Sequence, residues 1–303
     1  MFKGISSINS PTTTEILDIN LKYWLDWSFL NIGAFKNVTI TTSGSYGGQY
    51  SRLIPIKDRF NTDGKTWKTF HNNLVFESGL SYNTQPISIS GVYINGVLTT
   101  DYTLNYPEGK VIFTNPISSS SLVEMEYSYK YFNVYSAGEV DWLNEVQSDS
   151  FRIDRQDYST HSGEYSYNRL QLPAIVFETK NRTFKPYQLG HGQFSYNTLK
   201  FHILSNNRNI NEKISDILCE QNDKTIPLFN VQKVFASGVQ ALNVNGVLNP
   251  QAQTYNDLTN IHSEYFWNTT FLHKANLQET QELKTGLFYT PIHIMSEIIL
   301  PSI

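Results

Sequence analysis

Charged residues are scarce in this sequence, and no run of basic residues stands out. They make up 17% of the 303 residues, and the net charge is −4 with an isoelectric point near 6.0. An average soluble protein has roughly 25% charged residues. Binding to nucleic-acid phosphates requires clustered lysine and arginine. The composition therefore disfavours direct, sequence-specific nucleic-acid binding.

Cysteine is nearly absent, and long apolar runs are missing. The single cysteine, Cys219, excludes an intrachain disulfide framework and fits assembly in a reducing cytosol. Residues 1–10 lack the apolar core of a signal peptide, and no stretch approaches the ~20 apolar residues needed to span a bilayer. We therefore expect a soluble protein that neither enters membranes nor leaves the cell through a signal peptide.

Metal-binding and catalytic patterns are absent from the sequence as well. Its seven histidines stand in no metal-ligand spacing: His71, His161, His191, His202, His262, His273 and His293. We expect His202 and His273 to be packed or surface side chains of strands, and Gly190-His191-Gly192 to form a turn. Cys219 follows Leu218 on a short amphipathic helix, which predicts partial burial rather than a reactive thiol.

One carboxylate pair is a remaining candidate for chemistry. Glu124 and Glu126 stand two apart on a predicted strand and so share a face, where tyrosine neighbours would suit a sugar groove. Glycosidase carboxylates need a concave site, and we favour a solvent-facing pair. The sequence thus predicts no catalytic residue, no metal ligand and no cofactor, and we expect that the protein is not an enzyme.

Uncharged polar residues and tyrosine take the place of charge. The chain has 19 tyrosines, and a surface poor in charge and rich in aromatics resembles the core of a protein interface. The alternative is the codon bias of an AT-rich genome. That bias should also raise lysine, yet lysine and arginine together number only 23. We favour the interface interpretation.

The first half of the chain predicts one helix followed by an antiparallel β-module. Apolar residues three and four apart predict a helix over residues 14–30, which we expect to be buried by the fold or by another subunit, with Trp24 and Trp27 largely inaccessible. The Asn95-Gly96 and Glu108-Gly109 turns predict two hairpins of one sheet. Alternation then predicts a strand with a shared face over residues 122–135, formed by Val123, Met125, Tyr127, Tyr129 and Tyr131.

The second half predicts a smaller α+β domain. We place a boundary within residues 136–148, which gives domains 1–148 and 149–303, with a long loop over residues 154–169. Pro173 predicts an edge or bulge in the strand at residues 170–178. Residues 194–230 predict a strand, a helix capped by Asn206 or Asn207, and a second strand. Extended segments are expected at residues 263–277 and 285–300. The fold class is thus α+β and rich in strands.

Six segments of the sequence carry a resemblance to a known class of proteins: WLDWSFLNIGAF at 24–35, TSGSYGG at 42–48, ISGVYING at 89–96, LNYPEGKVIF at 104–113, RLQLPAIV at 169–176 and YQLGHGQ at 187–193. In these segments the sequence resembles virion structural proteins of tailed bacteriophages. The strand–helix–strand segment after residue 193 looks like the corresponding element of tail-terminator and tail-completion proteins. Tail terminators are usually shorter, so the first 150 residues would be an elaboration.

This resemblance implies a non-enzymatic ring or adaptor at the head–tail junction of a virion, assembled in the host cytoplasm. Its partners would be copies of itself and neighbouring proteins of the connector, tail tube or sheath, and DNA would pass through the lumen without sequence-specific binding. A different possibility is a tail-tip or baseplate β-module that binds host-surface carbohydrate or a receptor through tyrosine and tryptophan. A glycan-degrading enzyme is the third, and the one we favour least.

Overall fold

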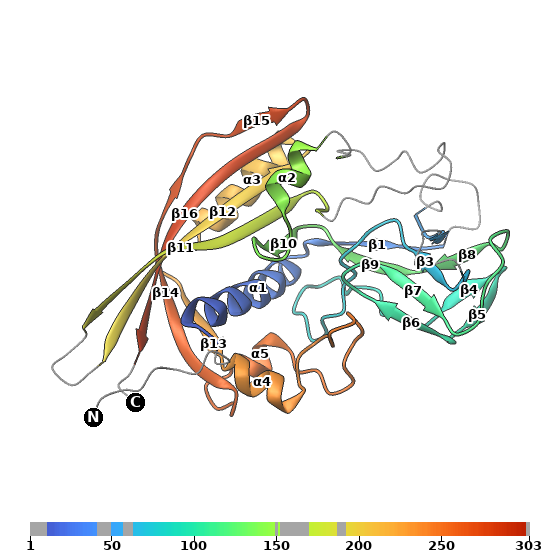
Figure 1. The fold of residues 1–303 in the computed structure, drawn as a ribbon, viewed down its shortest axis with the longest axis horizontal. Coiled ribbons are helices and arrows are strands. Elements are labelled where there is room, and N and C mark those ends of the chain that lie inside the picture. Colours follow the sequence, from blue (N-terminus) through green and yellow to red (C-terminus); the bar gives the residue numbers. More distant parts are fainter. Residues whose placement is uncertain are drawn as a thin grey trace.

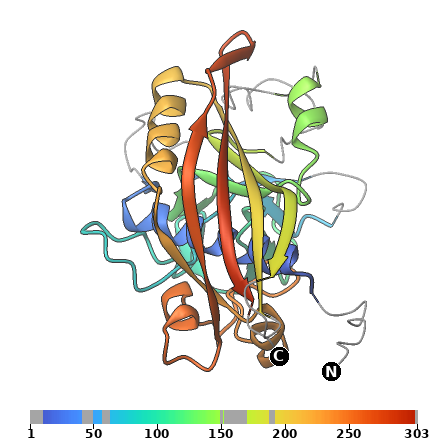
Figure 2. The ribbon, with the colours of Figure 1, turned by 90° about the vertical axis from the view of Figure 1, so that its left-hand side faces the viewer.

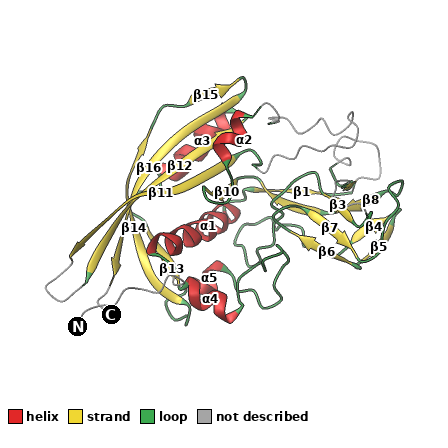
Figure 3. Cartoon of the chain, in the orientation of Figure 1, coloured by secondary structure: helices red, strands yellow, loops and turns green. Residues whose placement is uncertain are grey.

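The fold is mixed α+β and rich in strands, as predicted, and nearly all strand pairs are antiparallel. A large curved sheet lies at one end of the long axis and a group of small sheets at the other (Figure 1). Figure 3 shows that the few helices lie between and beside these sheets. The computed structural model describes residues 11–40, 50–56, 63–148, 151, 170–186 and 192–300.

The helix predicted at residues 14–30 is α1 (Thr13–Asn31). A capping box starts it: the Thr12 hydroxyl accepts from the Glu15 N–H at 3.2 Å, and the Glu15 carboxylate accepts from the Thr12 N–H. Within the single chain Trp24 and Trp27 are half-buried rather than largely inaccessible, and their burial by another subunit stays a prediction. The reason is that the fully buried stripe runs through the leucines at 17, 21 and 25, and the tryptophans lie on its flanks.

The second half of the chain forms most of a seven-stranded sheet. Its strands are β10 (Asn133–Ser136), β11 (Ala174–Pro186), β12 (Gln193–Ser205), β13 (Thr225–Phe229), β14 (Phe266–Leu277), β15 (Gln281–Lys284) and β16 (Leu287–Leu300). The order is β10-β11-β12-β16-β14-β13, and β15 pairs with β16. Only β10 and β11 are parallel. The extended segments predicted at residues 194–204, 263–277 and 285–300 are confirmed as β12, β14 and β16.

The predicted strand–helix–strand succession is also confirmed. Helix α3 (Arg208–Cys219) joins β12 to β13, and Asn207 caps it by accepting from the N–H groups of Asn209 and Ile210. However, β16 and β14 lie between β12 and β13. Three successive antiparallel pairings make β12 and β13 run in opposite directions, so the segment is not a crossover between neighbouring parallel strands.

The main core lies between the inner face of this sheet and two helices, α1 and α3. The outer face is partly covered by α2 (Trp142–Gln147), which the sequence analysis did not predict. Figure 2 looks at the outer face and shows the long strands in front of α1. The core does not follow the predicted division at residue 148, because α1 and β10 precede that residue and pack with the strands that follow it.

The small sheets form the other end of the molecule. One contains β2 (Ile54–Pro55), β3 (Thr66–Lys68), β7 (Lys110–Phe113) and β6 (Tyr102–Asn105), in that order. A second contains β5 (Val97–Thr99), β4 (Val92–Ile94) and β8 (Val123–Met125), and a two-stranded ribbon pairs β1 (Phe35–Val38) with β9 (Tyr127–Lys130). Their buried side chains form a second core.

Both predicted hairpins exist, but they belong to different sheets, so the prediction of one sheet is wrong. Asn95 and Gly96 both have positive φ (51° and 80°), as a type I′ turn requires, and Gly109 has φ 61°. The hairpins separate because β4 takes β8 as its second partner while β7 takes β3. The two sheets then enclose one core between them.

The shared face predicted for residues 122–135 is only partly correct. Val123, Met125 and Tyr127 are buried, but beyond Tyr127 the burial alternates with the opposite phase, and Tyr129 and Tyr131 are half-buried. The phase changes because the chain leaves the β4–β8 sheet and pairs with β1 before entering the large sheet.

Other segments complete the fold. Helices α4 (Val231–Ser237) and α5 (Tyr255–Thr259) pack on the second side of α1 and were not predicted. Pro173 predicted an edge or a bulge; it directly precedes β11, which is an interior strand, and the register shift of β11 lies farther along, between Thr179 and Arg182. The predicted loop at 154–169, the 42–48 segment and Gly190-His191 lie outside the described residues.

Candidate functional site

A cleft of about 1080 Å³ lies where α1 meets the small sheets and the α4–α5 segment. We call it the junction cleft. Its walls are the side of α1 facing away from the sheet, the loops at residues 72–78 and 107–110, strand β10, and residues 235–255. Ligand pockets commonly measure about 300–1,000 Å³, so the cleft is large enough for a small molecule.

A buried group of charges forms part of the cleft wall. The Lys130 ammonium lies 2.9 Å from an Asp26 oxygen and 2.6 Å from a Glu77 oxygen, and all three side chains are nearly inaccessible. Burial alone would lower the pKa of Lys130, but the two carboxylates raise it above its usual value. Burial raises the pKa of Glu77, against the lowering effect of Lys130. The sequence analysis missed this group.

A signal for this group was present in the sequence. Asp26 stands between two tryptophans of an amphipathic helix, and Lys130 stands in the run YSYKYF, where its neighbours are tyrosines and phenylalanine. Charges in such surroundings need a partner when they are buried. What the sequence does not give is the pairing, because Asp26, Glu77 and Lys130 are brought together only by the fold.

Further polar and aromatic groups line the junction cleft. Lys22 pairs with Glu139, and Lys110 lies 2.5 Å from Glu108. Asn72 is buried, and its Oδ1 has no hydrogen-bond partner among the described residues. The aromatic side chains in the lining are Tyr23, Trp27, Phe76, Tyr135, Phe235 and Tyr255.

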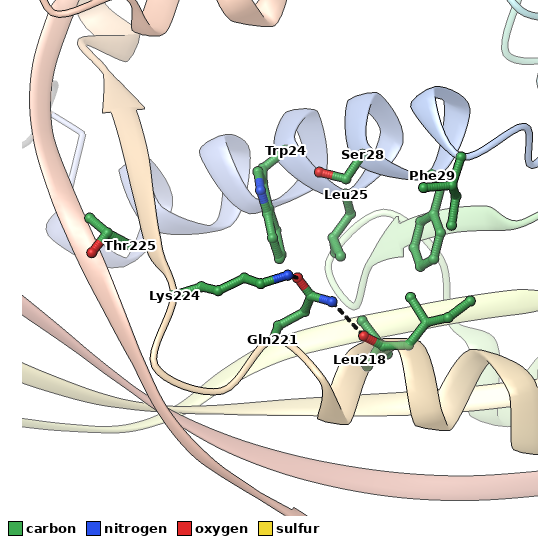
Figure 4. Close-up of a pocket in the computed structure, with 10 residues that line it drawn as sticks. Trp24, Leu25, Ser28, Phe29, Leu218, Gln221, Lys224 and Thr225 are labelled. Carbon is green, nitrogen blue, oxygen red and sulfur yellow. Dashed lines mark hydrogen bonds between the residues drawn. The ribbon is translucent and has the colours of Figure 1, made fainter. Parts of the chain in front are cut away.

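A smaller pocket, of about 280 Å³, lies on the other flank of α1. Figure 4 shows Trp24, Leu25 and Phe29 pointing from α1 toward the end of α3, where Gln221 accepts a hydrogen bond from Lys224 at 2.7 Å. Cys219 lies at this end of α3 and is half-buried, as predicted. Burial raises the pKa of the Cys219 thiol, which disfavours a reactive thiolate.

No histidine in the described part of the chain lines the junction cleft. The two ring nitrogens of His202 contact the Tyr289 hydroxyl and a Glu178 oxygen, both at 2.9 Å, and Trp142 packs on the ring. Burial lowers the pKa of His202. It is therefore a packed strand histidine, as predicted, and His273 is a partly exposed one that contacts Glu297 at 3.1 Å. In the described ranges no group of three or more His, Cys, Asp or Glu side chains could hold a metal ion.

The predicted carboxylate pair takes part in the fold of the small sheets. A Glu126 oxygen accepts from the Ile40 N–H at 3.2 Å, and a Glu124 oxygen lies 3.5 Å from the Ser51 hydroxyl. Both side chains are half-buried. Neither glutamate lines the junction cleft.

The outer face of the large sheet is the second candidate surface. Cross-strand partners share a face, and Tyr196, Glu297 and Phe271 are partners across β12, β16 and β14. Met295 and Ile299 alternate with Glu297 on the same face and are 48% and 44% exposed. The residues between them, such as Ser296 and Ile298, are buried on the inner face.

No protein-family model and no curated protein matches this chain. Among the described helices, none is both long enough and apolar enough to cross a membrane.

Proposed function

We propose that this chain is a non-enzymatic structural protein of a tailed-phage virion, which forms a ring or adaptor at the head–tail junction. The supporting observation is the outer face of the large sheet, where Tyr196 of β12 and Phe271 of β14 flank Glu297 of β16 and apolar side chains of β16 stand on either side of that glutamate. Met295 and Ile299 are the exposed apolar members of this face. Assembly through this face would place them in contact with a neighbouring copy or virion protein.

The shape of the sheet favours this proposal. Strands β11, β12 and β16 have 13, 13 and 14 residues, well above the usual five or six. Their ends extend beyond the helices that cover the inner face (Figure 1). Long strands of this kind offer each copy of the chain the same extended surface. A ring forms when that surface contacts a different surface of the next copy and the rotation closes.

The oligomeric state of the purified chain tests the proposal. We expect native mass spectrometry to detect a multimer and negative-stain images to show rings. A stable contact in such a ring should bury more than about 1,000 Å². The double substitution Met295→Glu/Ile299→Glu should shift the chain to monomer, because each carboxylate would have to be desolvated in the contact.

The matched control is Val244→Glu, since Val244 is fully exposed on the loop before α5 and lies outside the outer face. It should leave assembly unchanged. A monomeric wild-type chain, or a double variant that still assembles, would remove the support for this surface and for the ring.

A further inference from the structure

We infer that the junction cleft is a binding site for a neutral saccharide. This inference does not depend on the proposed assembly. The cleft lies on the side of α1 opposite the large sheet: its α1 residues are Ile19, Lys22, Tyr23, Asp26 and Trp27, whereas the leucines at 17, 21 and 25 face the sheet.

The balance of charge in the cleft disfavours a charged ligand. Four lysines and four carboxylates line it: Lys22, Lys68, Lys110 and Lys130, and Asp26, Glu77, Glu108 and Glu139. Lys22, Lys110 and Lys130 each pair with one or two of those carboxylates. At these three lysines an anion would have to displace a carboxylate, and a cation would have to displace a lysine. The fourth, Lys68, is buried, so a neutral ligand meets the least opposition.

The same ion pairs present fixed hydrogen-bonding groups. Lys130 holds Asp26 and Glu77 in place, and the Phe76 N–H donates to the second Glu77 oxygen at 3.1 Å. A buried ion pair is often less stabilising than apolar side chains of similar size, so stability alone does not explain such a group in a cleft wall. Hydroxyl groups both donate and accept, and they therefore match mixed carboxylate and ammonium surroundings.

Aromatic side chains supply the apolar half of a saccharide site. Trp27 is half-buried in α1 and lines the cleft, as do Tyr23 and Phe76. A sugar ring carries C–H groups on its faces and hydroxyls around its rim, so one face packs on an aromatic ring while the rim bonds to polar groups. The volume of about 1080 Å³ accommodates a short oligosaccharide.

Asn72 adds a further indication. It lines the cleft, is 6% exposed, and has an Oδ1 atom with no partner among the residues described. An unmatched buried acceptor is unfavourable in the free protein. An extended peptide is the competing occupant, but peptides bind mainly through the open edge of a sheet or an apolar groove. The edge strand β10 contributes Val134 and Tyr135 to the wall, but most of the lining consists of side chains of α1 and of loops.

The test uses the full chain on an array of neutral, sialylated and uronic-acid oligosaccharides, followed by calorimetry with each oligosaccharide that binds. We expect binding to at least one neutral oligosaccharide. Trp27→Ala should weaken that binding by about tenfold or more, because it removes the stacking platform. Glu77→Gln should weaken it as well, because a charged acceptor is lost. Trp24→Ala is the control, since Trp24 is half-buried on the same helix but lines the other pocket.

Several results would overturn the inference. They are no binding of any neutral oligosaccharide, binding of charged glycans only, or equal loss of affinity in Trp24→Ala and Trp27→Ala. Selection of extended peptides that bind wild type but not Trp27→Ala, without any glycan binding, would assign the cleft to a peptide instead. Circular dichroism of each variant distinguishes lost binding from lost folding. Failure of this test would leave the oligomer measurement untouched.

Discussion

Lys130 is the residue on whose charge two buried carboxylates depend. Replacing it with methionine keeps the bulk of the side chain but leaves Asp26 and Glu77 unpaired. We expect Lys130→Met to lower the free energy of unfolding by about 3–5 kcal/mol in urea denaturation at neutral pH. Lys110→Met removes a lysine from a more exposed pair and should cost less than about 1 kcal/mol.

The pH dependence of the Lys130→Met variant gives a second check at this site. Burial raises the pKa of Glu77, and the loss of Lys130 removes the main opposing effect. The folded variant then binds a proton at Glu77 more readily than the unfolded chain does. The loss of unfolding free energy relative to wild type should therefore shrink as the pH is lowered. A deficit that stays constant or grows in acid would show that the carboxylates are not the cause.

His202 should make stability fall in mild acid. Burial lowers the pKa of His202, so the folded chain favours the neutral ring that contacts Tyr289 and Glu178. The unfolded chain takes up the proton near the ordinary value of about 6.5, and the free energy of unfolding therefore falls below that pH. His202→Gln should flatten this dependence in urea titrations across mild acid, and a dependence as steep as that of wild type would contradict the prediction.

Among the elements, α1 and the edge strand β13 are joined by hydrogen bonds from the Asn20 side chain as well as by apolar packing. The Asn20 amide accepts from the Phe229 N–H at 2.8 Å and donates to the Phe229 carbonyl at 3.1 Å. Asn20→Ala removes this partner from the N–H and the carbonyl of Phe229. We expect the free energy of unfolding to fall by at least about 2 kcal/mol. Thermal melting checks this expectation, with Ser28→Ala on the same helix as the control. Equal melting temperatures of wild type and Asn20→Ala would contradict it.

Some features of the helices and strands follow from neighbouring residues in the sequence, and others depend on residues far away in the chain. The capping box at Thr12, the Asn207 cap and the Asn95-Gly96 turn act within a few residues, and each was predictable. Partner choice acts over long distances: β8 pairs with β4 and β16 enters between β12 and β14. The junction cleft was missed for the same reason, because its buried charges Asp26, Glu77 and Lys130 come from α1, a loop and β9. Helices of five to seven residues, such as α5, carry too little periodicity to be recognised.

At the scale of the whole molecule, the two halves of the chain share one core. Leu21 and Leu25 of α1 pack with Phe177 and Phe201 of the large sheet, and all four are almost fully buried. We therefore expect residues 149–303 expressed alone to aggregate or to lack fixed tertiary structure, since their apolar inner face would be uncovered. Co-expression with residues 1–148 should restore a folded complex. A well-dispersed NMR spectrum from the isolated segment would instead support the division at residue 148.

The position of β16 in the sheet has a consequence for how the protein is made. This strand lies between β12 and β14, yet it follows both of them in the sequence. While the ribosome is still adding residues 287–300, the strands on either side have open edges toward the missing one, and the sheet cannot close. During synthesis the nascent chain therefore exposes unpaired, apolar strands to its surroundings, which is the state that chaperones bind.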